Sequence, residues 1–332
     1  MIVDIYTHIF PDRFFAELER GSAKLGNMGK RMRALPKLFN LDLRFKDMDE
    51  IGDDYRQIIS LPNPPIEDLA DGEVAKDLAR VANDSMAELC ANHPKRFPAF
   101  AAAVSMHDVD FSIAEAERAI KMGARGVQTY TNIAGHPLDE PRFRPFFAAM
   151  AKHDLPIWLH PARTSAMADY AAEEKSRYEM WWCFGWPYET TIAMCRLVFD
   201  GIYDRHPDLK IITHHLGGGM IPFFDGRIGL GMEVLGNRTI EEDYSKVLSS
   251  LKRPHLEYFK EFYADTAMFG GTYGLPCGIS FFGADKVVFA SDAPLAAIPM
   301  HVKAIDGLNL APDVRRKIMV GNAEKLLNMK IG

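Results

Sequence analysis

Three histidines and one aspartate in this sequence each end or follow a short apolar segment typical of a buried strand. They are His8, His160, His215 and Asp292. Imidazoles together with a carboxylate suit Zn²⁺, Mn²⁺ or Fe²⁺. Such an ion lowers the pKa of a bound water to about 7 and can hold a substrate oxygen. The four residues therefore predict a site for one divalent metal ion, zinc or manganese.

Eight short segments, most of them apolar and β-branched, alternate with longer amphipathic segments along the chain, which predicts eight β–α units. The expected strands are Ile2–Tyr6, Gln57–Leu61, Ala99–Val104, Gly126–Thr129, Pro156–His160, Lys210–His214, Phe262–Asp265 and Lys286–Ala290. The expected helices include Ala75–Asn92, Phe111–Met122, Arg142–His153, Thr190–Arg205 and Asp313–Leu327. We predict an α/β fold, a single (β/α)8 TIM barrel over residues 1–332.

The barrel prediction explains why the four polar residues stand where they do. Active sites of such barrels lie at the carboxyl ends of the strands, so these side chains are expected to meet on one face. His93 and His206 precede strands instead of following them, which assigns them to the opposite, stabilising face.

Two segments have open interpretations. The stretch Pro11–Asp53 is polar, partly basic and poorly periodic, and it includes Lys30 and Arg31. It is either a solvated surface loop or a lid over the barrel mouth. The aromatic stretch Tyr178–Glu189, with Trp186 inside it, either forms the wall of a binding site for a flat substrate or belongs to a subunit interface.

Composition excludes several classes of protein. The net charge of −6 and the lack of a dominant basic stretch argue against a nucleic-acid partner. No apolar run is long enough to span a membrane, and no signal peptide is recognisable. The four cysteines form no C-x-x-C pair, which favours a reduced, cytoplasmic protein. We expect a homodimer or a higher homo-oligomer that acts on a small-molecule carboxylate.

Several motifs resemble the amidohydrolase-related family that contains aminocarboxymuconate semialdehyde decarboxylase. They include Asn92-His93-Pro94, His160-Pro161, His215 before the glycine run and Ser291-Asp292, in the family's order and spacing. The resemblance covers nearly the whole chain. It implies that His8, His160 and Asp292 hold one metal ion and that His215 is the catalytic acid and base, with Asp292 also able to move a proton.

The same family places arginines on substrate carboxylates. The matching positions are Arg44 and Arg227, and Arg163, which follows His160-Pro161, is a third candidate. The planar guanidinium matches two carboxylate oxygens, so we expect these arginines to bind substrate.

The chain departs from the family at Tyr6, where the family has the first histidine of an H-x-H pair. Three alternatives follow. Tyr6 ligates the metal as a phenolate, or the ligand position is filled by water or by His214, or the metal ion is weakly bound or absent. The histidine motif is also doubled. Because successive strand residues face opposite ways, His214 is expected to point outward.

The main hypothesis is a metal-dependent amidohydrolase-type lyase or hydrolase, foremost a decarboxylase, that uses His and Asp in acid–base catalysis. Its substrate is a small carboxylated aromatic-derived or muconate-like acid, as in the catabolism of aromatic compounds. The alternative is a hydrolase of a C–C bond in a meta-cleavage product or of a lactone. The second alternative is a metal-free, non-catalytic barrel that binds a ligand.

Overall fold

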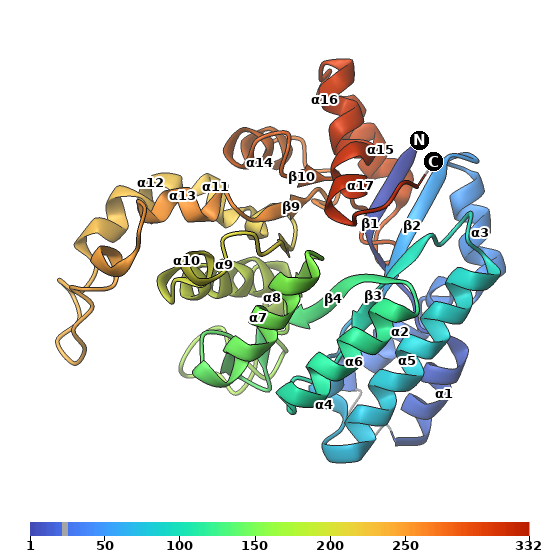
Figure 1. Cartoon of the computed structure of the whole chain (residues 1–332), viewed down its shortest axis with the longest axis horizontal. Coiled ribbons are helices and arrows are strands. Elements are labelled where there is room, and N and C mark those ends of the chain that lie inside the picture. The colour runs from blue at the N-terminus through green and yellow to red at the C-terminus, as the bar shows by residue number, and fades with distance from the viewer. Residues whose placement is uncertain (22–25, 332) are drawn as a thin grey trace.

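The computed structural model describes residues 1–21 and 26–331 and has an eight-stranded parallel sheet at its centre (Figure 1). Neighbouring strands in the sheet are also neighbours in the chain, as the eight β–α units predict. The strands are β1 (Ile2–His8), β2 (Tyr55–Ser60), β3 (Ala99–Ala103), β4 (Ala124–Tyr130), β7 (Ile157–His160), β8 (Ile211–Thr213), β9 (Tyr263–Asp265) and β10 (Val287–Val288). All eight predicted strands are confirmed, and the fold is the predicted α/β barrel. A separate antiparallel hairpin, β5 (Asn132–Ile133) with β6 (His136–Pro137), follows β4.

The sheet closes into a barrel because β1 also meets the segment around and after β10. Ile5 N donates to Phe289 O at 3.0 Å, and His8 N donates to Ala293 O at 2.7 Å. Asp292 N donates to Tyr6 O at 3.1 Å. These bonds bring the ends of the first and last strands, and with them His8 and Asp292, to the same place.

One cluster of buried side chains from seven of the strands fills the barrel, and a second cluster packs the strands against the surrounding helices. Trp158 is the largest fully buried side chain, and its indole N–H donates to the Ile5 carbonyl at 2.9 Å across the interior. The barrel interior is therefore a packed core, and its open end is where a ligand of such a barrel binds.

The helices surround the sheet, as α5 (Gly72–Asn92), α6 (Val109–Lys121) and α7 (Arg144–His153) show in Figure 1. Among residues 1–21 and 26–331, no helix has the length and apolar composition that crossing a bilayer requires.

The helix predicted over Thr190–Arg205 is interrupted at Gly201, whose φ of 74° is left-handed. The helices after β2 are α4 (Ile66–Leu69), α5 (Gly72–Asn92), α6 (Val109–Lys121), α7 (Arg144–His153), α8 (Met180–Cys183), α9 (Gly185–Phe199), α10 (Ile202–Arg205), α11 (Met220–Phe223), α12 (Asp225–Ile228), α13 (His255–Phe259), α14 (Gly274–Phe282), α15 (Ile298–Asp306), α16 (Pro312–Arg316) and α17 (Asn322–Leu326).

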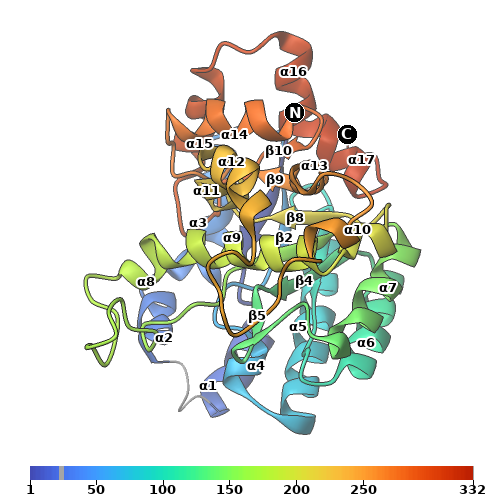
Figure 2. The same cartoon turned by 90° about the vertical axis from the view of Figure 1, so that its left-hand side faces the viewer.

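The stretch 11–53 is helical, so the expectation of a solvated loop is wrong for its described part. It contains α1 (Asp12–Gly21), α2 (Gly26–Arg33) and α3 (Leu41–Asp49), and residues 22–25 lie outside the described residues. Apolar side chains of these helices are buried in the main core, among them Phe14 and Met32. Figure 2 shows α2 beside α8, at the open end of the barrel.

Candidate active site

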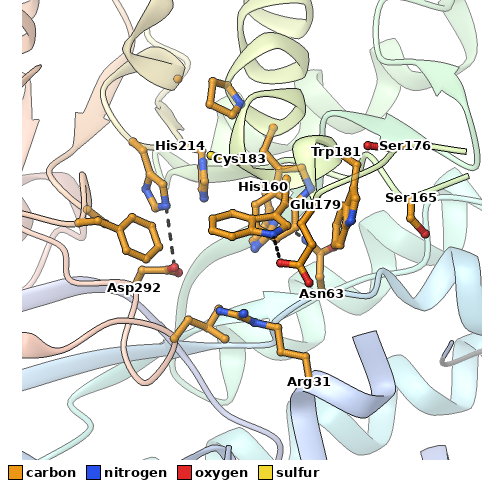
Figure 3. A pocket seen from close by; sticks show the side chains of 18 of the residues that line it. Arg31, Asn63, His160, Ser165, Ser176, Glu179, Trp181, Cys183, His214 and Asp292 are labelled. Atoms are coloured by element: carbon orange, nitrogen blue, oxygen red, sulfur yellow. Dashed lines mark hydrogen bonds and ion pairs between the residues drawn. The ribbon is translucent and has the colours of Figure 1, made fainter. Parts of the chain in front are cut away.

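A cavity of about 1000 Å³ opens at the carboxyl ends of the strands (Figure 3). Its inner part is formed by His160, His214, His215 and Asp292. The predicted meeting of strand-end side chains is thus present. We call the inner histidines and carboxylates the floor, which comprises His8, His160, His214, His215, Asp265 and Asp292.

His8 ends β1 and is completely buried. Its Nδ1 lies 3.1 Å from the Leu61 carbonyl, which can only accept, so Nδ1 carries the proton. Its other ring nitrogen, Nε2, lies 3.1 Å from Asp292 Oδ1. This nitrogen has no aligned hydrogen-bond partner among the described residues. The backbone of β2 thus fixes the ring so that its free nitrogen faces Asp292.

His160 ends β7 and has the same arrangement. Its Nδ1–H donates to the Pro161 carbonyl at 2.8 Å, which leaves Nε2 unprotonated. Asn63 donates to that carbonyl as well, at 3.0 Å. Burial, with a smaller effect of nearby His8, lowers the pKa of His160 to about 3, so the ring is neutral.

His214 and His215 both line the cavity, so the expectation that His214 points outward is wrong. Strand β8 ends at Thr213, and His215 and Leu216 adopt left-handed φ values of 44° and 53°. The alternation of a strand therefore stops before the two histidines, and their rings stack with centroids 3.2 Å apart. Burial, followed by the charges of the other histidines, lowers the pKa of His214 well below 6.5.

Asp265, which ends β9, is a site residue that the sequence analysis missed. Its Oδ1 accepts a hydrogen bond from His215 Nδ1 at 2.9 Å, and its Oδ2 accepts one from His215 N at 2.7 Å. Nε2 of His215 consequently faces Asp292, with 4.0 Å to Oδ2. Burial alone would lower the pKa of His215, but Asp265 and then Asp292 outweigh it and raise the pKa. The sequence did contain a signal for Asp265, because this residue stands at the end of a predicted strand.

Asp4 is a second missed residue, and it holds the segment that carries Asp292. It lies inside β1, is fully buried and accepts hydrogen bonds from Ser291 N at 3.0 Å and from the hydroxyls of Ser291 and Tyr55. Burial raises the pKa of Asp4 to about 7 against these hydrogen bonds. Its carboxylate thereby joins β1 and β2 to the turn before Asp292.

Tyr6 stands among the histidine rings of the floor. Its ring centroid lies 5.1 Å from that of His8, 5.7 Å from His160 and 5.4 Å from His214. The side chain is fully buried, and its hydroxyl has no hydrogen-bond partner in the described part of the chain. Burial, followed by the charges of Asp265 and Asp292, raises the pKa of Tyr6 well above 10. The protein by itself therefore keeps this residue a neutral phenol.

The donor atoms of the floor fit a divalent ion in their chemistry. His8 and His160 each bind a backbone carbonyl through Nδ1–H and keep Nε2 free, which is the usual arrangement of metal-ligating histidines. The 3.1 Å between His8 Nε2 and Asp292 Oδ1 matches two donors that are each about 2.1 Å from one ion. Across the described residues, however, no three His, Cys, Asp or Glu side chains are grouped tightly enough to enclose an ion as they stand.

The three arginines expected to bind substrate do not line the cavity. Arg44 is buried and donates from Nε to Gln57 Oε1 at 2.8 Å and from its guanidinium to the His8 carbonyl. Arg163 lies behind Trp186, whose indole N–H donates to the Arg163 carbonyl at 2.9 Å. Arg227 is exposed on α12. In this structure the guanidinium of Arg44 is thus bonded to the framework of β1 and β2.

Trp186 does line the cavity, in agreement with the first of the two interpretations of the aromatic stretch. Its ring centroid lies 5.9 Å from that of His160 and 6.3 Å from that of His214, edge to face. Trp181 and Trp182 line the same wall. The cavity also has basic residues that the sequence analysis did not select, foremost Lys30 and Arg31 of α2.

The barrel and its strand-end histidines define a class of protein, and comparison with known sequences shows which one. The sequence profile of the amidohydrolase family matches residues 3–329, so the chain belongs to that family. The predicted family membership is confirmed.

Among its relatives is a gamma-resorcylate decarboxylase from Polaromonas, 32% identical over 298 residues and covering 87% of each chain. A 2-amino-3-carboxymuconate-6-semialdehyde decarboxylase from Dictyostelium discoideum is 27% identical over 308 residues, which cover 88% of this chain and 81% of that one. A solved structure of the dihydroxybenzoic acid decarboxylase from Polaromonas, with bound manganese and 2-nitroresorcinol, has a TM-score of 0.77. It is 27% identical and covers 98% of this chain and 96% of its own. The prediction of an amidohydrolase-type enzyme, with decarboxylation as the first reaction, agrees with these relatives.

Proposed function

We propose that this protein is a metal-dependent decarboxylase of hydroxylated aromatic carboxylic acids. The observation that carries the proposal is the position of His215. Asp265 fixes its Nδ1–H, so its Nε2 is directed toward Asp292 in a cavity walled by tryptophans. An imidazolium in that position can deliver a proton to a flat ring bound against the wall.

The reaction replaces a carboxylate on the ring by a hydrogen. His215 in its protonated form gives its proton to the ring carbon that bears the carboxylate, and a hydroxyl on the ring supplies electron density to that carbon. The bond between the ring and the carboxylate then breaks, its electrons restore the aromatic ring, and CO₂ leaves. The proton taken from His215 is replaced from solvent, so the balance is one proton consumed and one CO₂ released.

His8, His160 and Asp292 would hold the ion, for the reasons of donor chemistry given above. When bound, such an ion supplies a positive charge that holds an anionic oxygen of the substrate. Manganese is supported by the Polaromonas structure, and zinc is the other candidate for this donor set. Tyr6 remains beside these ligands as a neutral phenol unless an ion lowers its pKa.

A homo-oligomer and a reducing compartment are part of the proposal. Phe184, which directly precedes α9, and Tyr188 and Ile192 within it recur at helical spacing. They are 66%, 51% and 38% exposed and form an apolar stripe of the kind that subunit contacts bury. The segment between α12 and α13 also extends away from the barrel in Figure 1. All four cysteines are free, in keeping with a cytoplasmic protein.

The test combines metal analysis with a stoichiometric assay. Purified wild type is expected to hold about one manganese or zinc ion per chain and to release CO₂ from a dihydroxybenzoate. A chelator should abolish turnover, and added Mn²⁺ should restore it. Asp292→Asn should be inactive yet folded. If the metal-free enzyme opens lactones or ring-cleavage products without releasing CO₂, the protein is a hydrolase and the decarboxylase proposal is wrong. If it turns over no acid at all, the protein is a non-catalytic barrel that binds a ligand.

A further inference from the structure

The cavity is much larger than a single aromatic ring requires. An engineered cavity of about 150 Å³ is enough to hold benzene, whereas this one measures about 1000 Å³. The floor occupies only its inner end, and the outer part extends to α2, α8 and the segment after β7. A one-ring acid at the floor would leave this outer part to water.

Aromatic rings continue from the floor to the outer part of the cavity. Beyond Trp186, which contacts His160, Trp182 lies 6.4 Å from the Trp186 ring and Phe269 lies 6.4 Å from Trp182. Phe269 is also 6.4 Å from the ring of His215, on the other side of the cavity. Such walls suit a second flat ring placed in line with the first.

The outer end of this path is basic. Lys30, Arg31, Lys175 and Arg177 line it, and we call these four residues the basic rim. The guanidinium of Arg31 lies 5.8 Å from the centre of the Trp182 ring. Arg177 has a weak ion pair with Glu173 at 3.6 Å. Within the described residues, no carboxylate pairs with Lys30, Arg31 or Lys175.

Glu179 is the acidic group that lines the cavity near the rim. It accepts a hydrogen bond from the Trp182 indole N–H at 2.7 Å, so it is already engaged with the wall. The rim therefore keeps an excess of positive charge that a ligand can neutralise.

From this arrangement we infer the substrate class of the site, an inference that rests on the proposed decarboxylase function. The substrate is a flat aromatic acid about two rings long with a second carboxylate at the end remote from the reacting one. Its reacting carboxyl lies at the floor, its second ring packs against the cavity-facing side of Trp182 and Phe269, and its distal carboxylate binds Arg31 with help from Lys30. Arg31 is then the specificity-determining residue, in place of the three arginines that the sequence suggested.

Two acids that differ only in the distal group test the inference. They are 4-hydroxybiphenyl-3-carboxylic acid and 4-hydroxybiphenyl-3,4′-dicarboxylic acid, and binding is followed by quenching of tryptophan fluorescence. Wild type should bind the dicarboxylate about 10-fold more tightly, the usual order for one charge-assisted contact. The preference should shrink in 1 M salt, because the rim is open to solvent.

Arg31→Ala should remove most of this preference and leave affinity for the monocarboxylate within about 2-fold. Arg33→Ala is the matched control, since Arg33 is on the same helix, pairs with Glu19 at 3.5 Å and lies outside the cavity lining. Equal affinity of wild type for both acids, or an equal effect of Arg31→Ala on both, overturns the inference. CO₂ release from 2,6-dihydroxybenzoate, measured in parallel, reports on the proposed function alone, so the two failures are distinguishable.

Discussion

The floor and the basic rim belong to one cavity but are built in opposite ways. The floor side chains end or follow barrel strands and are buried or nearly so, and several have a polar atom tied to the protein, as His8 has to Leu61 and His215 to Asp265. The rim side chains are exposed and come from a short helix and an irregular segment. The difference indicates that the floor determines which reaction occurs, because its donors cannot move, whereas the rim determines which acid is accepted.

The largest effect is expected from His215 at the floor. His215→Gln should lower kcat by about 10³-fold, since loss of a positioned general acid typically costs 10²–10⁴-fold. KM for a two-ring acid should change little, because the rim and the tryptophans remain. The assay is CO₂ release, with circular dichroism to establish folding. His206→Gln, after α10 on the opposite face, is the control, and equal losses in both variants would show that the effect is structural.

A second large effect separates the framework beneath the floor from the substrate site. Arg44→Met should lower the free energy of unfolding by about 2–4 kcal/mol, because it removes two buried hydrogen bonds of a charged group. Arg227→Met, at an exposed position, should change it by less than about 0.5 kcal/mol. Denaturant titration of both variants measures the difference. If Arg44→Met has unchanged stability but a KM that is 10–100-fold higher, Arg44 binds substrate and is not part of the structural framework.

A smaller effect should follow from the carboxylate behind His215. Asp265 raises the pKa of His215, although burial alone would lower it. A general acid works only when protonated, so activity is lost as pH rises through that pKa. Asp265→Asn lowers the pKa, and the alkaline limb of the kcat profile should therefore move to lower pH, with kcat reduced about 10-fold at neutral pH.

The control for this pH shift is Asp285→Asn, which removes an exposed carboxylate paired with Lys317 at 2.8 Å. Its profile should coincide with that of wild type. A shift of the Asp265→Asn profile toward higher pH, or no shift with kcat reduced, would mean that His215 acts in another protonation state.

The same contrast decides what could be predicted from the sequence. Floor residues were predictable because a buried parallel strand is visible as a short apolar run and its carboxyl end faces the site. Of the four residues selected in this way, His160, His215 and Asp292 line the cavity, and His8 lies behind it against Asp292. The prediction for His214 was wrong because it extended strand alternation past Thr213, where β8 ends and just before the left-handed backbone of His215. Asp265 was overlooked because an aspartate at a strand end resembles any other turn residue.

Rim residues were not predictable in the same way. Lys30 and Arg31 lie in a stretch without clear periodicity, and nothing local shows that α2 packs beside α8. Arg44 was selected by resemblance, but its direction depends on Gln57 and the His8 carbonyl, which are contacts that only the folded chain reveals.

The smallest effect is expected from Trp182, which joins the floor's aromatic wall to the rim. It is half-buried and presents a ring to the cavity between Trp186 and Arg31, so its loss removes one stacking face and no reacting group. Trp182→Ala should raise KM for a two-ring acid by about 3–10-fold, the size expected for one aromatic contact. KM for a one-ring acid and kcat for both should stay within about 2-fold. Phe184→Ala, in the same segment but 66% exposed and outside the cavity lining, should change none of these values. A fall in kcat as large as that of His215→Gln would break the distinction between floor and rim, because the wall would then be part of the reacting geometry.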